Sequence, residues 1–154
     1  METKPLVLVA DDEDFFRTPL AGALRFFGYE VEEARHGKEF YEKVDQLMRD
    51  KTPPSVLIVD NQMPNQQAEP DSQWCGFERV KEICNAWKGY DIGSRVLFLS
   101  RWGLVDLPDS YRDDAAKKFR LLENDRWLSV QTPFCVLKNK IEICSSLGGS
   151  YGHK

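Results

Sequence analysis

Short apolar runs alternate along this sequence with longer stretches in which apolar residues recur at helical spacing. Three runs, at residues 6–10, 56–59 and 96–99, are apolar throughout, which is typical of strands buried on both faces. The runs at 29–34 and 128–131 mix apolar with polar residues, which suits edge strands. Five strands alternating with five helices predict an α/β fold with a parallel sheet covered on both faces. With the half-polar strands at its edges, the sheet takes the doubly wound order 2-1-3-4-5 of a flavodoxin-like (βα)5 fold, whose ligand crevice lies at the carboxyl ends of strands one and three.

Five helical stripes separate or follow these strands. The first consists of Phe16, Leu20, Ala23, Leu24 and Phe27. Pro19 is expected near the start of this helix with Thr18 as its cap, and Gly28 is expected to end it. The other four stripes consist of Phe40, Val44, Leu47 and Met48; of Phe77, Val80, Cys84 and Trp87; of Tyr111, Ala115, Phe119 and Leu122; and of Leu137, Ile141 and Cys144.

Length and composition exclude several classes of protein. The chain has 154 residues, 42% hydrophobic and 30% charged, which is enough for one domain and too few for two. The apolar runs are far shorter than a membrane span and residues 11–14 are acidic, so we expect a cytoplasmic protein with no signal peptide and no membrane insertion. A net charge of −4 argues against direct binding to nucleic acid. The four cysteines lack the close pairing of zinc ligands, so reduced thiols are expected.

Acidic and hydroxyl side chains stand just past the predicted strands. Asp11 and Asp12 follow the first strand, and Asp60 follows the third. Ser100 follows the fourth strand and Thr132 the fifth. Because the carboxyl ends of parallel strands share one edge, three carboxylates converge there beside a hydroxyl, and a hard divalent cation such as Mg²⁺ relieves their repulsion. This predicts chemistry on a phosphoryl group with Asp60 as the nucleophile, whereas a single Asp after a strand is more often a helix cap or a turn residue.

At these residues the chain resembles the receiver domain of two-component response regulators, over residues 6–147. The acid pair together with the later Asp-x-x-Met-Pro is a specific combination, and either half alone is weak. The segments that carry the resemblance are Leu8-Val9-Ala10-Asp11-Asp12-Glu13, Gly28-Tyr29-Glu30-Val31-Glu32-Glu33-Ala34 with Gly37, Val59-Asp60-Asn61-Gln62-Met63-Pro64, Ser100, and Pro133-Phe134.

The resemblance implies a role in phosphorelay signal transduction. Asp60 would accept a phosphoryl group from a phosphohistidine on a histidine kinase or a histidine phosphotransfer protein. Asp12 would hold Mg²⁺ directly and Asp11 through water, with Asp60 and the backbone carbonyl of Gln62 completing the protein ligands. Ser100 would donate a hydrogen bond to the phosphoryl group and drive a conformational switch that a downstream protein reads. Such a chain is not an enzyme beyond catalysing its own phosphorylation and dephosphorylation.

Three positions depart from the family pattern. Thr132 stands where receivers usually carry a Lys that pairs with the aspartate and the phosphoryl oxygens, and Ser129 stands where an aromatic switch residue is expected. Arg101 replaces a residue that is usually small, and it either supplies the missing positive charge or faces solvent. These changes leave open a degenerate receiver that acts as a phosphorylation-independent interaction module. A phosphatase with an aspartate nucleophile is disfavoured, because Gln62 occupies the position of its second acid.

Two segments, at residues 65–75 and 103–126, run longer than in the family pattern and border the predicted site. The first is polar and rich in turn residues, which predicts an exposed loop. Its Trp74 covers the site, anchors a partner or packs on the domain. We expect one receiver domain at 1–147 with a flexible tail at 148–154, either as a single-domain regulator or as part of a longer protein.

Overall fold

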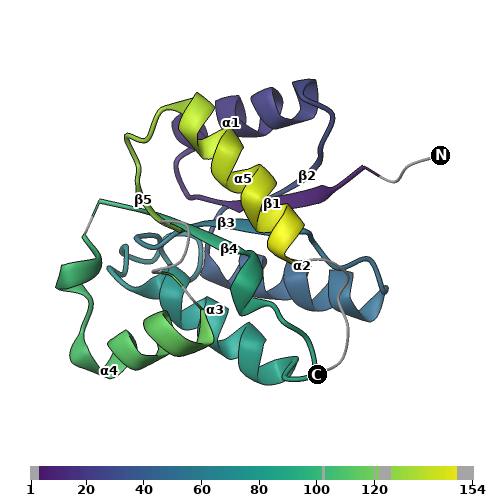
Figure 1. The fold of residues 1–154 in the computed structure, drawn as a ribbon. Coiled ribbons are helices and arrows are strands. Elements are labelled where there is room, and N and C mark those ends of the chain that lie inside the picture. The colour runs from purple at the N-terminus through teal and green to yellow at the C-terminus, as the bar shows by residue number, and fades with distance from the viewer. Residues whose placement is uncertain (1–3, 102, 120, 122–125, 149–154) are drawn as a thin grey trace.

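The computed structural model describes residues 4–101, 103–119, 121 and 126–148. All five strands run parallel in one sheet in the order β2-β1-β3-β4-β5 (Figure 1), which confirms the predicted topology. The strands are β1 (Leu6–Ala10), β2 (Glu30–Ala34), β3 (Val56–Asp60), β4 (Val96–Ser100) and β5 (Trp127–Ser129). Strands β1 and β3 are neighbours, with Val9 opposite Ile58. Their carboxyl ends therefore lie side by side at the point where the strand order reverses.

Helices cover both faces of the sheet (Figure 1). The five α-helices are α1 (Asp14–Phe26), α2 (Gly37–Arg49), α3 (Cys75–Ala86), α4 (Asp109–Asp113) and α5 (Phe134–Gly148). Val7 and Val9 of β1 pack with residues of α1 and α5, whereas Leu8 packs with residues of α2 and α3. This alternation follows from the two-residue period of a strand, and it explains why the central strands are apolar throughout. No helix in the described part of the chain is both long enough and apolar enough to cross a membrane.

Helix α1 begins earlier than the sequence predicts. Its N-cap is Glu13, and the backbone amides of Phe16 and Arg17 donate to the Glu13 carbonyl at 3.0 and 2.9 Å. Thr18 is therefore not the cap, and Pro19 lies inside the helix. A helix start near Pro19 is favoured because the missing N–H of proline costs least there. The first turn forms earlier instead, with the Glu13 carbonyl as its acceptor.

The apolar stripe of α1 is buried only in part: Leu24 is fully buried and Leu20 packs against the core. Phe16 and Phe27 are 44% and 49% exposed, whereas Arg17 is buried. The guanidinium of Arg17 donates to the backbone carbonyl of Asp11 at 2.7 Å and to the Glu33 carboxylate at 3.2 Å. Because these contacts turn the Arg17 side of the helix toward the sheet, the two phenylalanines face outward.

Residues 103–119, the described stretch that follows β4, are largely helical. Tyr111, Ala115 and Phe119 pack against the core, as their spacing predicts, and Leu122 lies outside the described residues. The segment holds α4 between a 3-10 turn η2 (Leu104–Asp106) and a π-helical turn η3 (Asp114–Lys118), and another 3-10 turn, η1 (Gly93–Arg95), precedes β4. The described part of the extra length, at 103–119, is thus built of helical turns, and it adds to the layer that contains α3.

Strand β5 is shorter than predicted and starts one residue earlier. It ends at Ser129 because the chain turns there, with the Thr132 amide donating to the Ser129 carbonyl at 2.9 Å. Helix α5 follows and ends at Gly148. The rest of the predicted tail lies outside the described residues.

Candidate metal centre

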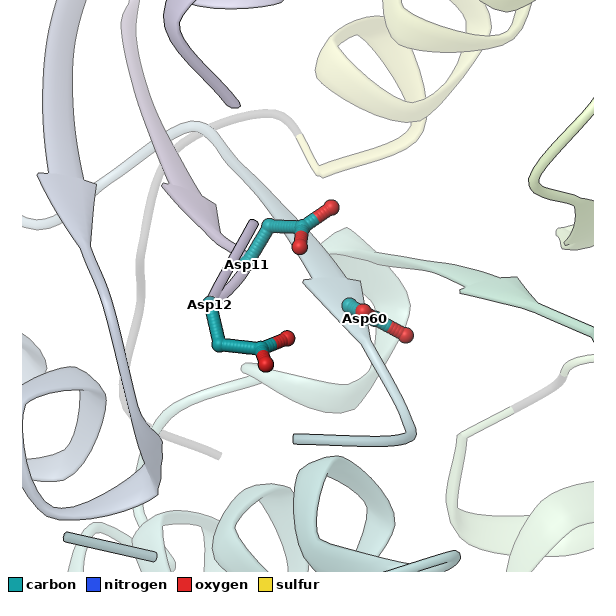
Figure 2. Close-up of side chains that lie close together, drawn as sticks. All are labelled: Asp11, Asp12 and Asp60. Carbon is teal, nitrogen blue, oxygen red and sulfur yellow. The ribbon is translucent and has the colours of Figure 1, made fainter. Parts of the chain in front are cut away.

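Three carboxylates meet where β1 and β3 end side by side. Asp60 is the last residue of β3, and Asp11 and Asp12 directly follow β1. One oxygen from each carboxylate lies within 4.8 Å of the others, and Figure 2 shows Asp11 and Asp12 extending from the end of β1 toward the side of Asp60. Three hard oxygen donors at this spacing fit a divalent cation such as Mg²⁺. The structure thus brings together the trio that the strand ends predict.

Burial and mutual repulsion disfavour negative charge in this cluster. Burial, followed by the neighbouring Asp11 charge, raises the pKa of Asp60 to about 8. Burial, followed by the charges of Asp71 and Asp11, raises the pKa of Asp12 to about 6. Burial also raises the pKa of Asp11, against a hydrogen bond from the Glu13 amide. Without a cation the cluster therefore holds protons near neutral pH, and cation binding displaces them.

Arg17 fixes the loop that carries Asp11, and sequence reasoning missed it. The Asp11 carbonyl accepts from Arg17, while the Asp11 amide donates to the Ala34 carbonyl at 3.0 Å. The Asp11 carboxylate accepts from the Glu13 amide at 2.9 Å. The backbone and carboxylate of Asp11 are thus fixed by three hydrogen bonds. The available signal was a basic residue next to the apolar stripe of the first helix, close behind two acids.

Asn61 fixes the loop that follows Asp60. Its side chain is wholly buried, donates to the Gln73 carbonyl at 2.8 Å and accepts from the Phe77 amide at 2.8 Å. The Asp60 carboxylate in turn accepts from the Gln62 amide at 3.0 Å. The Gln62 backbone therefore lies beside the cluster, and the role of its carbonyl as a metal ligand stays a prediction.

The extended loop at 65–75 closes directly onto β3. The Gly76 amide donates to the Asn61 carbonyl at 3.0 Å. A Cβ on Gly76 would lie 2.5 Å from the carbonyl oxygen of Asp60, closer than real Cβ contacts come. Trp74 is half-buried and packs against the core, so of its three predicted roles the structure supports packing on the domain. The glycine is required where the loop returns, since no side chain fits between it and Asp60.

The remaining predicted site residues lie at the same edge of the sheet. Ser100 is the buried last residue of β4 and lies opposite Ser129 in the sheet. Thr132 is half-buried beyond the end of β5. Arg101 donates to the Glu13 carboxylate at 2.9 Å, with the two side chains 58% and 43% exposed. Arg101 is thus exposed to solvent and paired with Glu13, a partner that the sequence did not indicate.

Two cavities border the cluster. One, of about 340 Å³, opens between α1 and the β5–α5 connection, and most of its wall is apolar side chains of α1 and α5 together with Leu99 and Val130. Its polar end consists of Asp11, Glu13, Asp60, Arg101 and Thr132.

The second cavity, of about 350 Å³, lies between Asp12 and the 65–75 loop. Polar groups line most of it, including His36, Glu69 and Asp71. Sequence reasoning did not single out Asp71, although a long polar loop bordering the site was the signal for such a residue.

A doubly wound parallel sheet with an acid cluster at its switch point defines a class of α/β proteins that bind ligands at this edge. No family model matches the sequence. A curated protein, response regulator RR06 of Streptococcus pneumoniae, is 36% identical over 77 residues, which are 50% of this chain and 30% of that protein. The match therefore spans less than a third of that relative.

Solved receiver domains share the fold over nearly the whole chain. Response regulator TrrA of Thermotoga maritima, solved in complex with Mg²⁺ and BeF, has a TM-score of 0.60 and 24% identity, covering 91% of this chain and 98% of that one. The Francisella response regulator 1452 receiver domain has a TM-score of 0.64 and 21% identity, covering 94% and 98%. The receiver domain of a LuxO-like repressor from Vibrio parahaemolyticus has a TM-score of 0.65 and 17% identity, covering 95% and 93%. The chain has the fold of response-regulator receiver domains.

Proposed function

We propose that this chain is a phosphoacceptor receiver, in which Asp60 takes a phosphoryl group from a phosphohistidine of a histidine kinase or phosphotransfer protein. One observation carries the proposal: three carboxylates from β1 and β3 lie within 4.8 Å of one another at the switch point of a receiver fold. The Thermotoga response regulator of the same fold was solved with Mg²⁺ and BeF bound, which supports a cation in this chain as well. The chain itself then performs its phosphorylation and dephosphorylation, with no other enzymatic activity.

Asp60 and the two acids beside it have separate roles in the proposed phosphoryl transfer. In the transfer, the N–P bond of the donor breaks as an O–P bond forms to the Asp60 carboxylate, which must be ionised. Because burial raises the pKa of Asp60 to about 8, the carboxylate is protonated in much of the cation-free protein at neutral pH. Asp11, Asp12 and Asp60 hold Mg²⁺, which when bound supplies the positive charge that ionises Asp60 and neutralises the phosphoryl oxygens.

Ser100 stands on the strand next to β3 and donates a hydrogen bond to the phosphoryl group in this proposal. Its position as the last residue of β4 lets a small movement pass into the segment that leads to α4. That segment is the surface by which a downstream protein would read the phosphorylated state.

The test is intact mass after incubation with Mg²⁺ and a small phosphodonor such as acetyl phosphate. We expect one phosphoryl adduct that is stable in acid, labile in base, and absent from Asp60→Asn. Asp109→Asn is the matched control, since Asp109 is an exposed carboxylate on α4, and it should form the adduct normally. If no adduct forms and beryllofluoride does not bind either, the phosphoacceptor proposal is wrong.

A second candidate, a phosphorylation-independent interaction module, is favoured by the charge arrangement. Arg101 is engaged with Glu13, and Thr132 carries no charge at the position where receivers usually have a Lys. This candidate predicts the same partner binding by the wild type and by Asp60→Asn, with or without a phosphodonor. Dependence of that binding on the adduct would eliminate it.

A further inference from the structure

The cavity between α1 and the β5–α5 connection joins an apolar wall to an acidic end. Phe16, Leu20 and Ala23 of α1 face Phe134 and Leu137 of α5 across it. The Phe134 ring is held by stacking on Phe27, with ring centroids 5.6 Å apart. The wall is therefore formed by side chains of two helices, and the volume of about 340 Å³ is within the range of small-molecule sites, roughly 300–1,000 Å³.

The charge at the polar end favours a cation as the occupant. Three acids, Asp11, Glu13 and Asp60, line this end, against one base, Arg101. The base already forms an ion pair with Glu13 at 2.9 Å. Asp11 and Asp60 form no ion pair with a basic side chain of the described residues. A negatively charged ligand would therefore disfavour ionisation of these acids further, whereas a positive group would favour their ionised form and pair with it, as a metal cation would.

A bare metal ion would occupy only the polar end of this cavity and leave the apolar wall without a ligand. Mg²⁺ is satisfied by oxygen ligands and water, and it makes no use of aromatic and aliphatic side chains. A ligand that matches both ends of the cavity has an apolar body and one positive group. Burial of the body supplies affinity, and the carboxylates set the orientation.

We propose that this cavity binds small amphiphilic cations, with an alkyl or arylalkyl body between α1 and α5 and a primary ammonium group directed at Asp11 and Asp60. This proposal is separate from a receiver's phosphoryl chemistry, and it does not depend on Asp60 being a phosphoacceptor. It shares two carboxylates with the metal centre, so Mg²⁺ and the ammonium group compete.

Phenethylamine is the probe, with 2-phenylethanol and 3-phenylpropionate as neutral and anionic analogues of similar size. A titration of the full chain with phenethylamine, monitored by protein-observed NMR, should give a dissociation constant in about the millimolar range. We expect binding at least about tenfold weaker for the alcohol and the acid, because they lose the attraction of the carboxylates. Saturating Mg²⁺ should weaken amine binding several-fold.

Variants of α1 locate the site. Ala23→Phe fills the cavity and should reduce amine affinity at least about tenfold, and Phe16→Ala should reduce it about threefold by removing part of the wall. Phe15→Ala is the matched control: Phe15 is the adjacent phenylalanine, 85% exposed and outside the cavity, so affinity should be unchanged. A thermal melt of each variant separates loss of binding from loss of folding.

Three results would overturn the proposal. They are equal or tighter binding of the alcohol or the acid, unchanged amine affinity in folded Ala23→Phe, and no binding of any probe at about 10 mM. The titration uses no phosphodonor, so its failure leaves Asp60 phosphorylation untouched. Failure of the mass assay likewise leaves the cation site standing.

Discussion

Two cavities of nearly equal volume, about 340 and 350 Å³, border the same three carboxylates and are built in opposite ways. The one between α1 and α5 is mainly apolar, and the only ion pair at its rim among the described residues is the exposed Arg101–Glu13 contact. The one under the 65–75 loop is polar, and the loop beside it is tied to β3 through buried Asn61. The cluster is thus fixed on the loop side and accessible on the helix side, so we expect substitutions to alter stability on the first and ligand access on the second.

The largest effect should come from Gly76→Ala on the fixed side. A Cβ there lies 2.5 Å from the Asp60 carbonyl oxygen and 2.9 Å from the Asn61 Cα, so the backbone that carries Asp60 must move. We expect the free energy of unfolding to fall by about 2 kcal/mol or more, measured by urea denaturation, and Mg²⁺ binding to weaken.

Gly22→Ala is the control for that experiment. Gly22 is exposed within α1, and a Cβ added there would meet no heavy atom within 4 Å beyond its own neighbours in the helix. The substitution should stabilise the protein by about 0.5–1 kcal/mol, because alanine loses less backbone entropy in a helix. Equal effects at the two glycines would show that the close approach at Asp60 does not constrain the fold.

A smaller loss of stability should follow Asn61→Leu. The leucine leaves the Gln73 carbonyl and the Phe77 amide without their partner, at a cost of about 1–3 kcal/mol. Hydrogen exchange at the Phe77 amide should also become faster. Asn139→Leu, on the exposed side of α5, is the matched control and should change stability by less than about 0.5 kcal/mol. If hydrogen exchange at the Phe77 amide is unchanged in Asn61→Leu, the Asn61 side chain does not fix this loop.

The strands and the carboxylate trio could be predicted from sequence because both depend on local pattern. An apolar run of five residues predicts a buried strand without knowledge of its partners, and parallel topology then places all strand ends at one edge. Asp11, Asp12 and Asp60 meet for that reason alone. The burial of Asn61 was not predictable, because its partners come from a loop whose path is set by tertiary contacts.

The two ends of the predicted α1 stripe were assigned to the core wrongly for a related reason. Hydrophobic periodicity assigns Phe16 and Phe27 to the core together with Leu24, yet both phenylalanines are exposed, and Arg17 is buried with Leu24 on the core-facing side. That arginine is satisfied by the Asp11 carbonyl and by Glu33 of a neighbouring strand, and neither contact has a sequence pattern. Leu20 and Ala23 of the same stripe line the apolar cavity beside the exposed Phe16, and the sequence did not predict that cavity.

The charge of the cluster between the two cavities should appear in the pH dependence of stability. The pKa values of Asp60 and Asp12 are raised in the folded protein to about 8 and about 6, above a normal value of 3.8. The folded state therefore binds more protons than the unfolded state between these values, so the free energy of unfolding should fall as pH rises from 4 toward 8. Urea denaturation across this range without metal measures it.

Mg²⁺ and Asp60→Asn both sharpen that measurement. Mg²⁺ should reduce the loss of stability at high pH, because it replaces the protons as the balancing charge. Asp60→Asn should flatten the slope above pH 6, whereas Asp109→Asn, on an exposed carboxylate, should leave the slope as it is. A slope that is unchanged in Asp60→Asn would mean that this carboxylate is not the group that titrates.

The smallest effect on stability is expected from the Arg101–Glu13 pair, at the rim of the cavity between α1 and α5. Both side chains are substantially exposed, so Arg101→Ala and Glu13→Gln should each change the free energy of unfolding by less than about 1 kcal/mol.

The effects of these two substitutions on phosphorylation should be opposite if Arg101 supplies the charge that Thr132 lacks. Arg101→Ala removes that charge and should slow adduct formation about two- to fivefold, a range set by an exposed ion pair. Glu13→Gln releases Arg101 toward the cluster and should accelerate it by a similar factor. Equal rates in both variants and the wild type would assign Arg101 to the rim of the cavity alone.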